Sequence, residues 1–370
     1  MKKIFYFFSL LLVTSNAFAG IYTTPGTGVR WTLSQLVANS GGMVTFNGTD
    51  YLVQDSVTVA TRDTLDISTN SVVKFNITAL LRVNGTLLIN PTTGVLFTAV
   101  NTASGFRGVF LENSSGSIIK KLTYEYASSF RLSDSSPSFE DCIFRYNNNS
   151  ITLSNGTLSL FRSNPIITNC SFIDNFRAAI QGGANIANAP KITNCLFSGN
   201  NSSNQNVPHI NLGASGSDTT KIIGSRIINP GGIRTGGIGF LPLGNLNVVI
   251  NGNLIANNRY GISLQGGTIN SLVSYNRIEN NNIENNPNLG GSGIAFAGGT
   301  AASQQNSIVT GNIFSNNLWG ITIQNRARPN LGNLQNSDTS DDGKNLFINN
   351  TNANTPLIDL YNNSIDSIYA

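Results

Sequence analysis

A short pattern that recurs along most of the chain limits its possible folds more than any other feature. At eight places between residues 142 and 345, an anchor residue is followed two positions later by a large apolar residue. The spacing between successive anchors varies from 23 to 36 residues. Periods of this size are typical of arrays in which each repeat is one supersecondary unit that stacks on the next. The anchors are Cys142, Cys170, Cys195, Ser225, Asn253, Asn276, Asn312 and Asn345.

Apolar residues flank the anchors at fixed places. The third position before the anchor is apolar in every repeat except the last, where it is Asp342. A second apolar run follows each anchor after a turn, and its first residue is always isoleucine. Apolar residues two apart indicate strands with one buried face. The residues two places after the anchors are Phe144, Phe172, Phe197, Ile227, Ile255, Ile278, Phe314 and Phe347, and the isoleucines are Ile151, Ile180, Ile210, Ile238, Ile262, Ile294, Ile321 and Ile358.

Two short strands per repeat, separated by turns, predict an all-β parallel solenoid in which each repeat forms one coil. A parallel sheet with crossover helices would need a helical pattern between the strands. The intervals here are too short, and too rich in Asn and Gly, to supply such helices.

Asparagine has a mechanical role in this interpretation. The 370 residues include 54 Asn and 37 Gly, whereas charged residues make up only 11%. Both residue types tolerate the left-handed backbone that tight turns need. Asn side chains at equal places in coils about 4.8 Å apart can also form a ladder of amide hydrogen bonds. The predicted ladder residues are the anchor column, which becomes polar toward the C-terminus, and Asn200, Asn257, Asn280, Asn316 and Asn349.

Residues 1–19 have the pattern of a bacterial-type secretory signal. Lys2-Lys3 precedes a short apolar stretch, and Ala17-Phe18-Ala19 is a small-x-small site, so cleavage is expected after Ala19. The apolar stretch is too short to span a bilayer. Without its two lysines the chain carries 20 basic and 18 acidic residues, a net charge of +2. We expect an exported or cell-surface protein with no membrane span and no nucleic-acid partner.

The mature chain divides into two parts in this interpretation. Residues 20–105 form an N-terminal cap and the first coils, and residues 106–370 form the repeats. The segment Trp31–Val37 is the one helix-like stretch, and we expect it to cover the open core of the first coil. The expected early strands are Asp63–Ile67, Ser71–Phe75, Leu80–Leu88, Val95–Ala99, Gly108–Leu111 and Ile118–Tyr126.

With these residues placed, the chain resembles the secreted bacterial right-handed parallel β-helix repeat proteins of the pectate-lyase-like superfamily. The likeness covers nearly all of the mature chain. It is carried by the module over residues 71–87, by the Asn-x-aromatic-Gly-Ile coils at Tyr260 and Trp319, and by the segment over residues 329–363. The resemblance implies a right-handed parallel β-helix. Relatives continue with one more strand, so it also implies that the chain is truncated at Ala370 or capped by something else.

The resemblance does not fix an activity, because this fold hosts lyases, hydrolases, binders and fibres. The shared His motif of the lyases and the Gly-His-Gly and Arg-Ile-Lys motifs of the polygalacturonases have no counterpart here. The only histidine, His209, precedes a buried isoleucine and is interpreted as incidental. We therefore favour a structural or glycan-binding module. The alternative is a polysaccharide lyase or glycoside hydrolase acting in the lateral groove of the β-helix.

The densest acidic segment contains Asp338, Asp341 and Asp342. Clustered carboxylates on a loop that ends in Gly suit calcium, which takes hard oxygen ligands. They also suit a catalytic pair of a glycosidase. The favoured interpretation is a solvated loop, and no cofactor is expected unless calcium binds here.

Candidate ligand-binding residues lie on the outer face of the coils. Arg226 and Arg277 share one outward position two coils apart, where Glu279 offers an ion pair and an anionic sugar offers the alternative. Arg177 and Arg259 align in a similar way beside the second strand, and the same two alternatives, an ion pair or a contact with an anionic sugar, apply to them. Tyr260 and Trp319 share an aligned position, where they either pack on the coil below or stack on a sugar ring of an extracellular polysaccharide.

The three cysteines share one inward column on adjacent coils. Parallel side chains rarely meet the torsion that a disulfide needs, so we expect Cys142, Cys170 and Cys195 to be stacked thiols. The last coil lacks a cap in the sequence, which makes docking of another chain on the C-terminal coil a weaker possibility.

Overall fold

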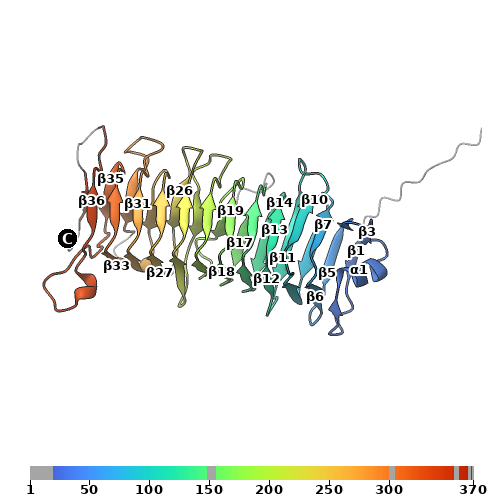
Figure 1. Ribbon diagram of the computed structural model, residues 1–370. Coiled ribbons are helices and arrows are strands. Elements are labelled where there is room, and N and C mark those ends of the chain that lie inside the picture. Colours follow the sequence, from blue (N-terminus) through green and yellow to red (C-terminus); the bar gives the residue numbers. More distant parts are fainter. Residues whose placement is uncertain (1–19, 148–155, 300–304, 354–357, 366–367, 369–370) are drawn as a thin grey trace, which may run out of the picture.

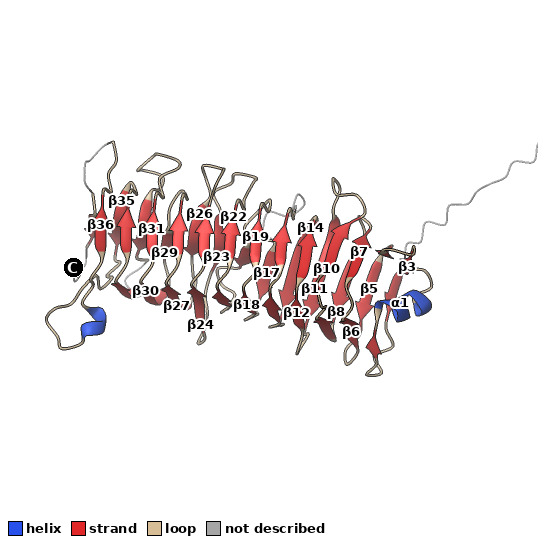
Figure 2. Cartoon of the chain, viewed as in Figure 1, coloured by secondary structure: helices blue, strands red, loops and turns tan. Residues whose placement is uncertain are grey.

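The protein is an elongated stack of coils. The computed structural model describes residues 20–147, 156–299, 305–353, 358–365 and 368. The predicted signal segment, Ile151 and Ala370 lie outside these residues. Figure 1 shows the strands lying side by side along one axis, with the N-terminal and C-terminal coils at opposite ends. Figure 2 shows that strands and turns dominate. Among the described residues, helix is confined to α1 (Leu33–Asn39) and a 3-10 turn over Thr339–Asp341.

Three sheets, here called A, B and C, run along the stack, and their strands pair in parallel except β3 (Val44–Phe46) and β4 (Tyr51–Val53) at the N-terminal end of sheet C, which pair antiparallel. Sheet A contains β1 (Ile21–Thr23), β5 (Ser56–Val59), β8 (Leu80–Val83), β11 (Phe106–Glu112), β14 (Ala127–Ser133), β17 (Leu158–Phe161), β20 (Ile180–Gly182), β23 (Pro208–Leu212), β26 (Gly236–Phe240), β29 (Ile262–Gln265), β32 (Ser292–Ala297), β35 (Trp319–Asn325) and β37 (Leu360–Ser364). Sheet B contains β2 (Arg30–Trp31), β6 (Thr64–Ile67), β9 (Thr86–Ile89), β12 (Ile118–Lys120), β15 (Ser138–Glu140), β18 (Ile166–Thr168), β21 (Lys191–Thr193), β24 (Thr219–Ile223), β27 (Asn245–Asn251), β30 (Thr268–Ser274) and β33 (Gln305–Thr310). Sheet C contains β3 (Val44–Phe46), β4 (Tyr51–Val53), β7 (Ser71–Phe75), β10 (Val95–Ala99), β13 (Leu122–Glu125), β16 (Ile143–Arg145), β19 (Ser171–Ile173), β22 (Leu196–Ser198), β25 (Arg226–Ile228), β28 (Leu254–Ala256), β31 (Arg277–Glu279), β34 (Ile313–Ser315) and β36 (Leu346–Ile348).

Each full coil has three strands, so the expectation of two strands per repeat is wrong. The anchor residue does not continue a strand: it lies at the sharp turn between a sheet B strand and a sheet C strand. The residue before the anchor has a left-handed backbone even where it is not glycine, as at Asn169, Asn194 and Tyr275. The same error joined two pairs of early strands, because Leu80–Leu88 divides at Asn84-Gly85 and Ile118–Tyr126 divides at Lys121.

The apolar columns read from the repeat are confirmed. The aromatic column pairs in register along sheet C, and the rings of Phe144, Phe172 and Phe197 stack with centroids 4.8 and 5.0 Å apart. The isoleucine column pairs in register from Ile180 through Ile321.

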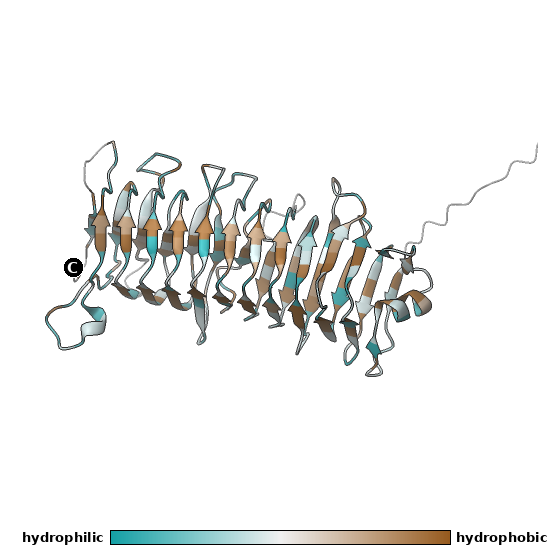
Figure 3. Cartoon of the chain, viewed as in Figure 1, coloured by the Kyte–Doolittle hydropathy of each residue, from teal (hydrophilic) through white to brown (hydrophobic). Residues whose placement is uncertain are grey.

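Two members of the isoleucine column are misplaced in the prediction. Leu158, rather than Ile151, pairs with Ile180, and Leu360, rather than Ile358, pairs with Ile321. Loops of variable length precede these strands, so that counting from the anchor gives the wrong register. Figure 3 shows the apolar residues gathered along the strands.

Two internal ladders cross the coils at the turns on either side of sheet C. In the anchor column, each Nδ2 donates to the next Oδ1, at 2.9 Å from Asn253 to Asn276 and from Asn276 to Asn312, and at 3.0 Å from Asn312 to Asn345. The second ladder joins Asn258, Asn281, Asn317 and Asn350 through bonds of 3.0 to 3.1 Å. The predicted rungs Asn257, Asn280, Asn316 and Asn349 are one residue too early, because these residues take the left-handed turn and the next residue points inward.

The cysteines occupy the N-terminal half of the anchor column. All three are buried free thiols, and each Sγ donates to the carbonyl two residues earlier at 3.3 Å. Contacts with the neighbouring thiols, together with burial, raise the pKa of Cys170. The expected stack of thiols is therefore present.

A short helix, α1 (Leu33–Asn39), lies at the N-terminal end of the stack, as predicted to within two residues (Figure 1). Thr32 caps it and Gln35 completes a capping box. Leu33 and Leu36 are buried in the core of the first coils. Trp31 belongs to β2 instead of the helix, and no helix among the described residues is long and apolar enough to cross a membrane.

Candidate functional site: a groove on sheet A

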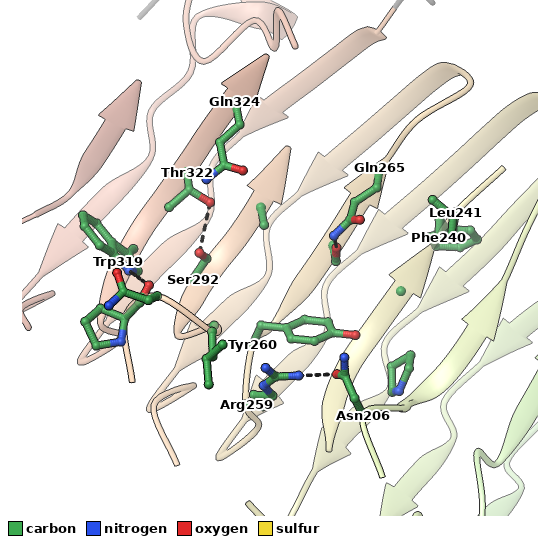
Figure 4. A pocket seen from close by; sticks show the side chains of 18 of the residues that line it. Asn206, Phe240, Leu241, Arg259, Tyr260, Gln265, Ser292, Trp319, Thr322 and Gln324 are labelled. Atoms are coloured by element: carbon green, nitrogen blue, oxygen red, sulfur yellow. Dashed lines mark hydrogen bonds between the residues drawn. The ribbon is translucent and has the colours of Figure 1, made fainter. Parts of the chain in front are cut away.

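A groove of about 610 Å³ lies on the outer face of sheet A in the C-terminal half of the stack (Figure 4). Its volume falls within the range of small-ligand sites. The floor is one outward position from each of six successive coils, which pair in strict register. At about 4.8 Å per coil the floor is about 24 Å long. The floor residues are Asn211, Gly239, Ser263, Ala295, Thr322 and Tyr361.

Most of the floor is made of small, uncharged side chains. Each floor residue up to Thr322 lies between two buried apolar residues of a strand, as Ser263 does between Ile262 and Leu264. Period-two alternation therefore turns it outward. Thr322 is hydrogen bonded to Ser292 at 3.0 Å (Figure 4), and Gln265 donates to Ser263 at 2.8 Å. Four of the six floor residues therefore offer a hydroxyl or amide group, and Gly239 and Ala295 lie between them.

Tyr260 and Trp319 both line one wall of the groove (Figure 4). Tyr260 lies on the segment that leads from β28 of sheet C to β29 of sheet A, and Trp319 is the first residue of β35. The Tyr260 ring covers Gly236 of the preceding coil, where a methyl group would overlap it. Burial raises the pKa of Tyr260 to about 12, so the phenol stays protonated. Trp319 donates from Nε1 to the Pro287 carbonyl at 3.0 Å, and its ring lies 5.1 Å from that of Tyr361. Both aromatic rings are half-buried, with one side facing the groove.

Arg259 holds the same wall together. Its Nη1 donates to Asn206 Oδ1 (Figure 4), and its Nε donates to the Glu284 carboxylate, so that Arg259 links loops that leave three different coils. The Arg259 and Glu284 side chains are only 10% and 12% exposed. Leu241 and Leu289, each 53% exposed, add apolar surface to the groove lining.

The other predicted residues lie elsewhere. Arg226 and Arg277 are exposed on sheet C, separated by Leu254 in one outward column, and Arg277 forms the expected ion pair with Glu279. Arg177 is buried, with its guanidinium over the Phe176 ring.

The three aspartates of the acidic segment lie beside the last strand of sheet B, around a 3-10 turn over Thr339–Asp341. Asp338 accepts from the Ser340 N–H at 2.9 Å, and Asp342 lies 3.4 Å from Lys344. Asp341 Oδ2 accepts from Asn330 and Asn336, while its buried Oδ1 has no partner in the structure. The described residues contain no group of three His, Cys, Asp or Glu side chains placed to hold a metal. Calcium binding stays a prediction, to be tested by melting with calcium and with EDTA.

Most of the groove was missed by reasoning from sequence. Asn206 lines the groove and Glu284 supports its wall from loops that meet Arg259 across 53 and 25 residues of sequence, so no motif marks them. The floor did leave a signal, because the residue between the two apolar residues of each second run is small and uncharged over five coils. Because side chains alternate along a strand, that column must point outward. The sequence alone could therefore have identified it as a continuous outer surface along the stack.

Comparison with known proteins assigns the fold. No family model matches the chain, and no curated protein matches it. Among solved structures, it is similar to two mutants of the periplasmic alginate epimerase AlgG, at 13% identity in each case, over 91% of this chain and 84% of the epimerase, with TM-scores of 0.57 and 0.54. The Dettilon tailspike protein aligns over 80% of this chain and 60% of its own, at 14% identity and a TM-score of 0.49. The chain has the right-handed parallel β-helix fold that the resemblance implied.

Proposed function

We propose that the protein is an exported or cell-surface β-helix that binds polysaccharide in the groove on sheet A. The observation that carries this proposal is the groove itself: half-buried aromatic rings on one wall and a long floor that carries hydroxyl and amide groups. Sugar rings offer apolar C–H faces to aromatic side chains and hydroxyl groups to polar ones. A floor that advances one residue per coil suits an extended polymer better than a compact metabolite. Alginate, the polysaccharide in the name of the similar epimerase, supports polysaccharide as the ligand class by analogy of fold alone.

The lining of the groove favours binding over catalysis. Among the described lining residues there is no Asp, Glu, His, Cys or Lys, and Tyr260, whose pKa is raised by burial, stays protonated. Lyases and glycosidases need a general acid or base within reach of the sugar.

Affinity retention on immobilised polysaccharides tests the proposal. We expect the chain over residues 20–370 to be retained on at least one member of a polysaccharide panel, and Trp319→Ala to weaken retention about tenfold or more, since buried aromatic anchors dominate such surfaces. Tyr275→Ala is the matched control, because Tyr275 is 69% exposed and lies outside the groove. Equal retention of wild type and Trp319→Ala on every polymer would refute the assignment of the groove.

One observation favours a second candidate, a polysaccharide lyase or hydrolase. The Asp341 carboxylate is buried with one oxygen unpartnered, which is an uncommon state for a carboxylate without a role. The same panel decides, because a lyase or hydrolase would create new chain ends and Asp341→Asn would abolish them. Retention without new ends would exclude this activity on the polymers tested.

A further inference from the structure

The charge inside the groove is set by one residue. Arg259 is the only described lining residue that is charged at neutral pH, since the remaining polar residues are amides, hydroxyls and phenols. An unpaired arginine at this place would attract carboxylate or sulfate groups of an acidic polysaccharide. The state of Arg259 therefore decides which glycans the groove accepts.

Arg259 is already occupied. Two of its three nitrogens donate within the wall, to the Glu284 carboxylate and to Asn206. Glu284 lies on the loop between β31 and β32, and the ion pair is almost completely shielded from solvent. Shielded charges attract strongly and are screened little by salt, so a ligand carboxylate would have to displace Glu284 or lie beside it. Either arrangement is unfavourable, because like charges in a poorly solvated place repel.

The other lining residues that the structure describes offer a carboxylate no further counter-charge. Leu241 and Leu289 expose apolar surface to the groove, and the Trp319 Nε1 proton is already donated to Pro287. An anionic sugar would therefore lose hydration without gaining an ion pair.

We propose that the groove selects uncharged polysaccharides and that Glu284 sets this selectivity by neutralising Arg259. This inference rests on the proposed function. Removing the Glu284 charge leaves a guanidinium in the groove and turns the site toward acidic polymers.

The experiment compares retention on a panel of neutral polysaccharides and on polyuronates. Wild type is expected to be retained on a neutral polymer and not on polyuronates. Glu284→Gln, which keeps a hydrogen-bonding side chain, is expected to gain about tenfold in retention on a polyuronate. Glu279→Gln removes a carboxylate paired with Arg277 on sheet C, outside the groove, and should change neither preference.

A double variant separates charge from loop damage. Arg259→Gln with Glu284→Gln has no charge in the wall and should lose the gain on polyuronates. The same gain in the double variant, or in Glu279→Gln, would overturn the role of Glu284. Equal retention of wild type on neutral and acidic polymers, abolished by Trp319→Ala, would overturn the selectivity and leave the proposed function standing. Retention on no polymer would overturn both. If Glu284→Gln does not fold, the wild-type preference alone decides.

Discussion

His209, in β23, is buried beside the column of the second ladder, where neighbouring coils carry asparagine. The first part of the second ladder runs through Asn147, Asn175 and Asn200, and the next coil does not continue it because Asn229 turns its amide to its own loop. The His209 ring fills the gap, with Nδ1 3.1 Å from Asn200 Nδ2. An amide nitrogen can only donate, so Nδ1 accepts and the proton belongs on Nε2, on the side of Asn258. Histidine here acts as a structural replacement for an amide.

This placement predicts a pH dependence of stability. Burial lowers the pKa of His209 to about 3, whereas an unfolded histidine titrates near 6.5. The folded pKa is depressed, so stability is complete above pH 6.5 and is lost as the unfolded state takes up a proton between pH 6.5 and 3. We expect the free energy of unfolding of wild type, relative to His209→Gln, to fall by roughly 3 kcal/mol between pH 7 and 4. Denaturant titrations at several pH values measure the difference, and a constant difference would contradict it.

At the scale of the element, the ladders hold the turns rather than the strands. Asn281 is fully buried and accepts from both the backbone N–H and Nδ2 of Asn258, while its own Nδ2 donates to Ile255 and Asn317. One side chain thus satisfies polar groups on both neighbouring coils. Solvent cannot replace these bonds, because the turn lies against a continuous apolar core.

We therefore expect Asn281→Ala to lower the free energy of unfolding by roughly 3 kcal/mol, since it leaves several buried groups unpaired. The control is Asn270→Ala. Asn270 belongs to an exposed ladder on sheet B, with hydrogen bonds of 3.0 Å to Asn247 and Asn306. Its substitution should lower the free energy of unfolding by less than about 1 kcal/mol, because water can replace the lost hydrogen bonds. Equal decreases in the free energy of unfolding of the two variants would show that the internal ladder stabilises the protein no more than the exposed one.

At the scale of the whole molecule, each coil depends on both neighbours, because no single coil can bury its own apolar face. Cys142, Cys170 and Cys195 lie on three adjacent coils in the middle of the stack, at 0%, 1% and 3% exposure. Reaching any of these thiols requires opening the sheets on either side.

Thiol labelling under native conditions tests this cooperativity. We expect mass spectra to contain molecules with no label or with three labels and few with one or two, because the coils open together. Tyr275→Cys introduces a thiol at an exposed turn and should be labelled at once, which checks the reagent. Labelling of the native thiols one at a time would show that coils open independently.

The repeat determined which residues face the core, and it did so correctly because burial of apolar side chains is set by local alternation. Ile262 and Leu264 point inward whatever the length of the loop before them. Loop length did defeat the prediction of register at Ile151 and Ile358. It also hid the third strand, because a turn made by a single left-handed residue leaves no gap in an apolar pattern.

The sequence by itself determined a stacked β-fold, its internal column of thiols and amides, and the position of its N-terminal helix. These features follow from contacts within a coil and between coils of equal pattern. Only the tertiary structure decided that Tyr260 and Trp319 share a groove while Arg226 and Arg277 face another sheet, and that Arg259 is neutralised. The groove joins loops from several coils, such as Asn206 with Arg259, 53 residues apart. Such contacts depend on the length and conformation of each loop, and the periodic pattern of apolar residues predicts neither.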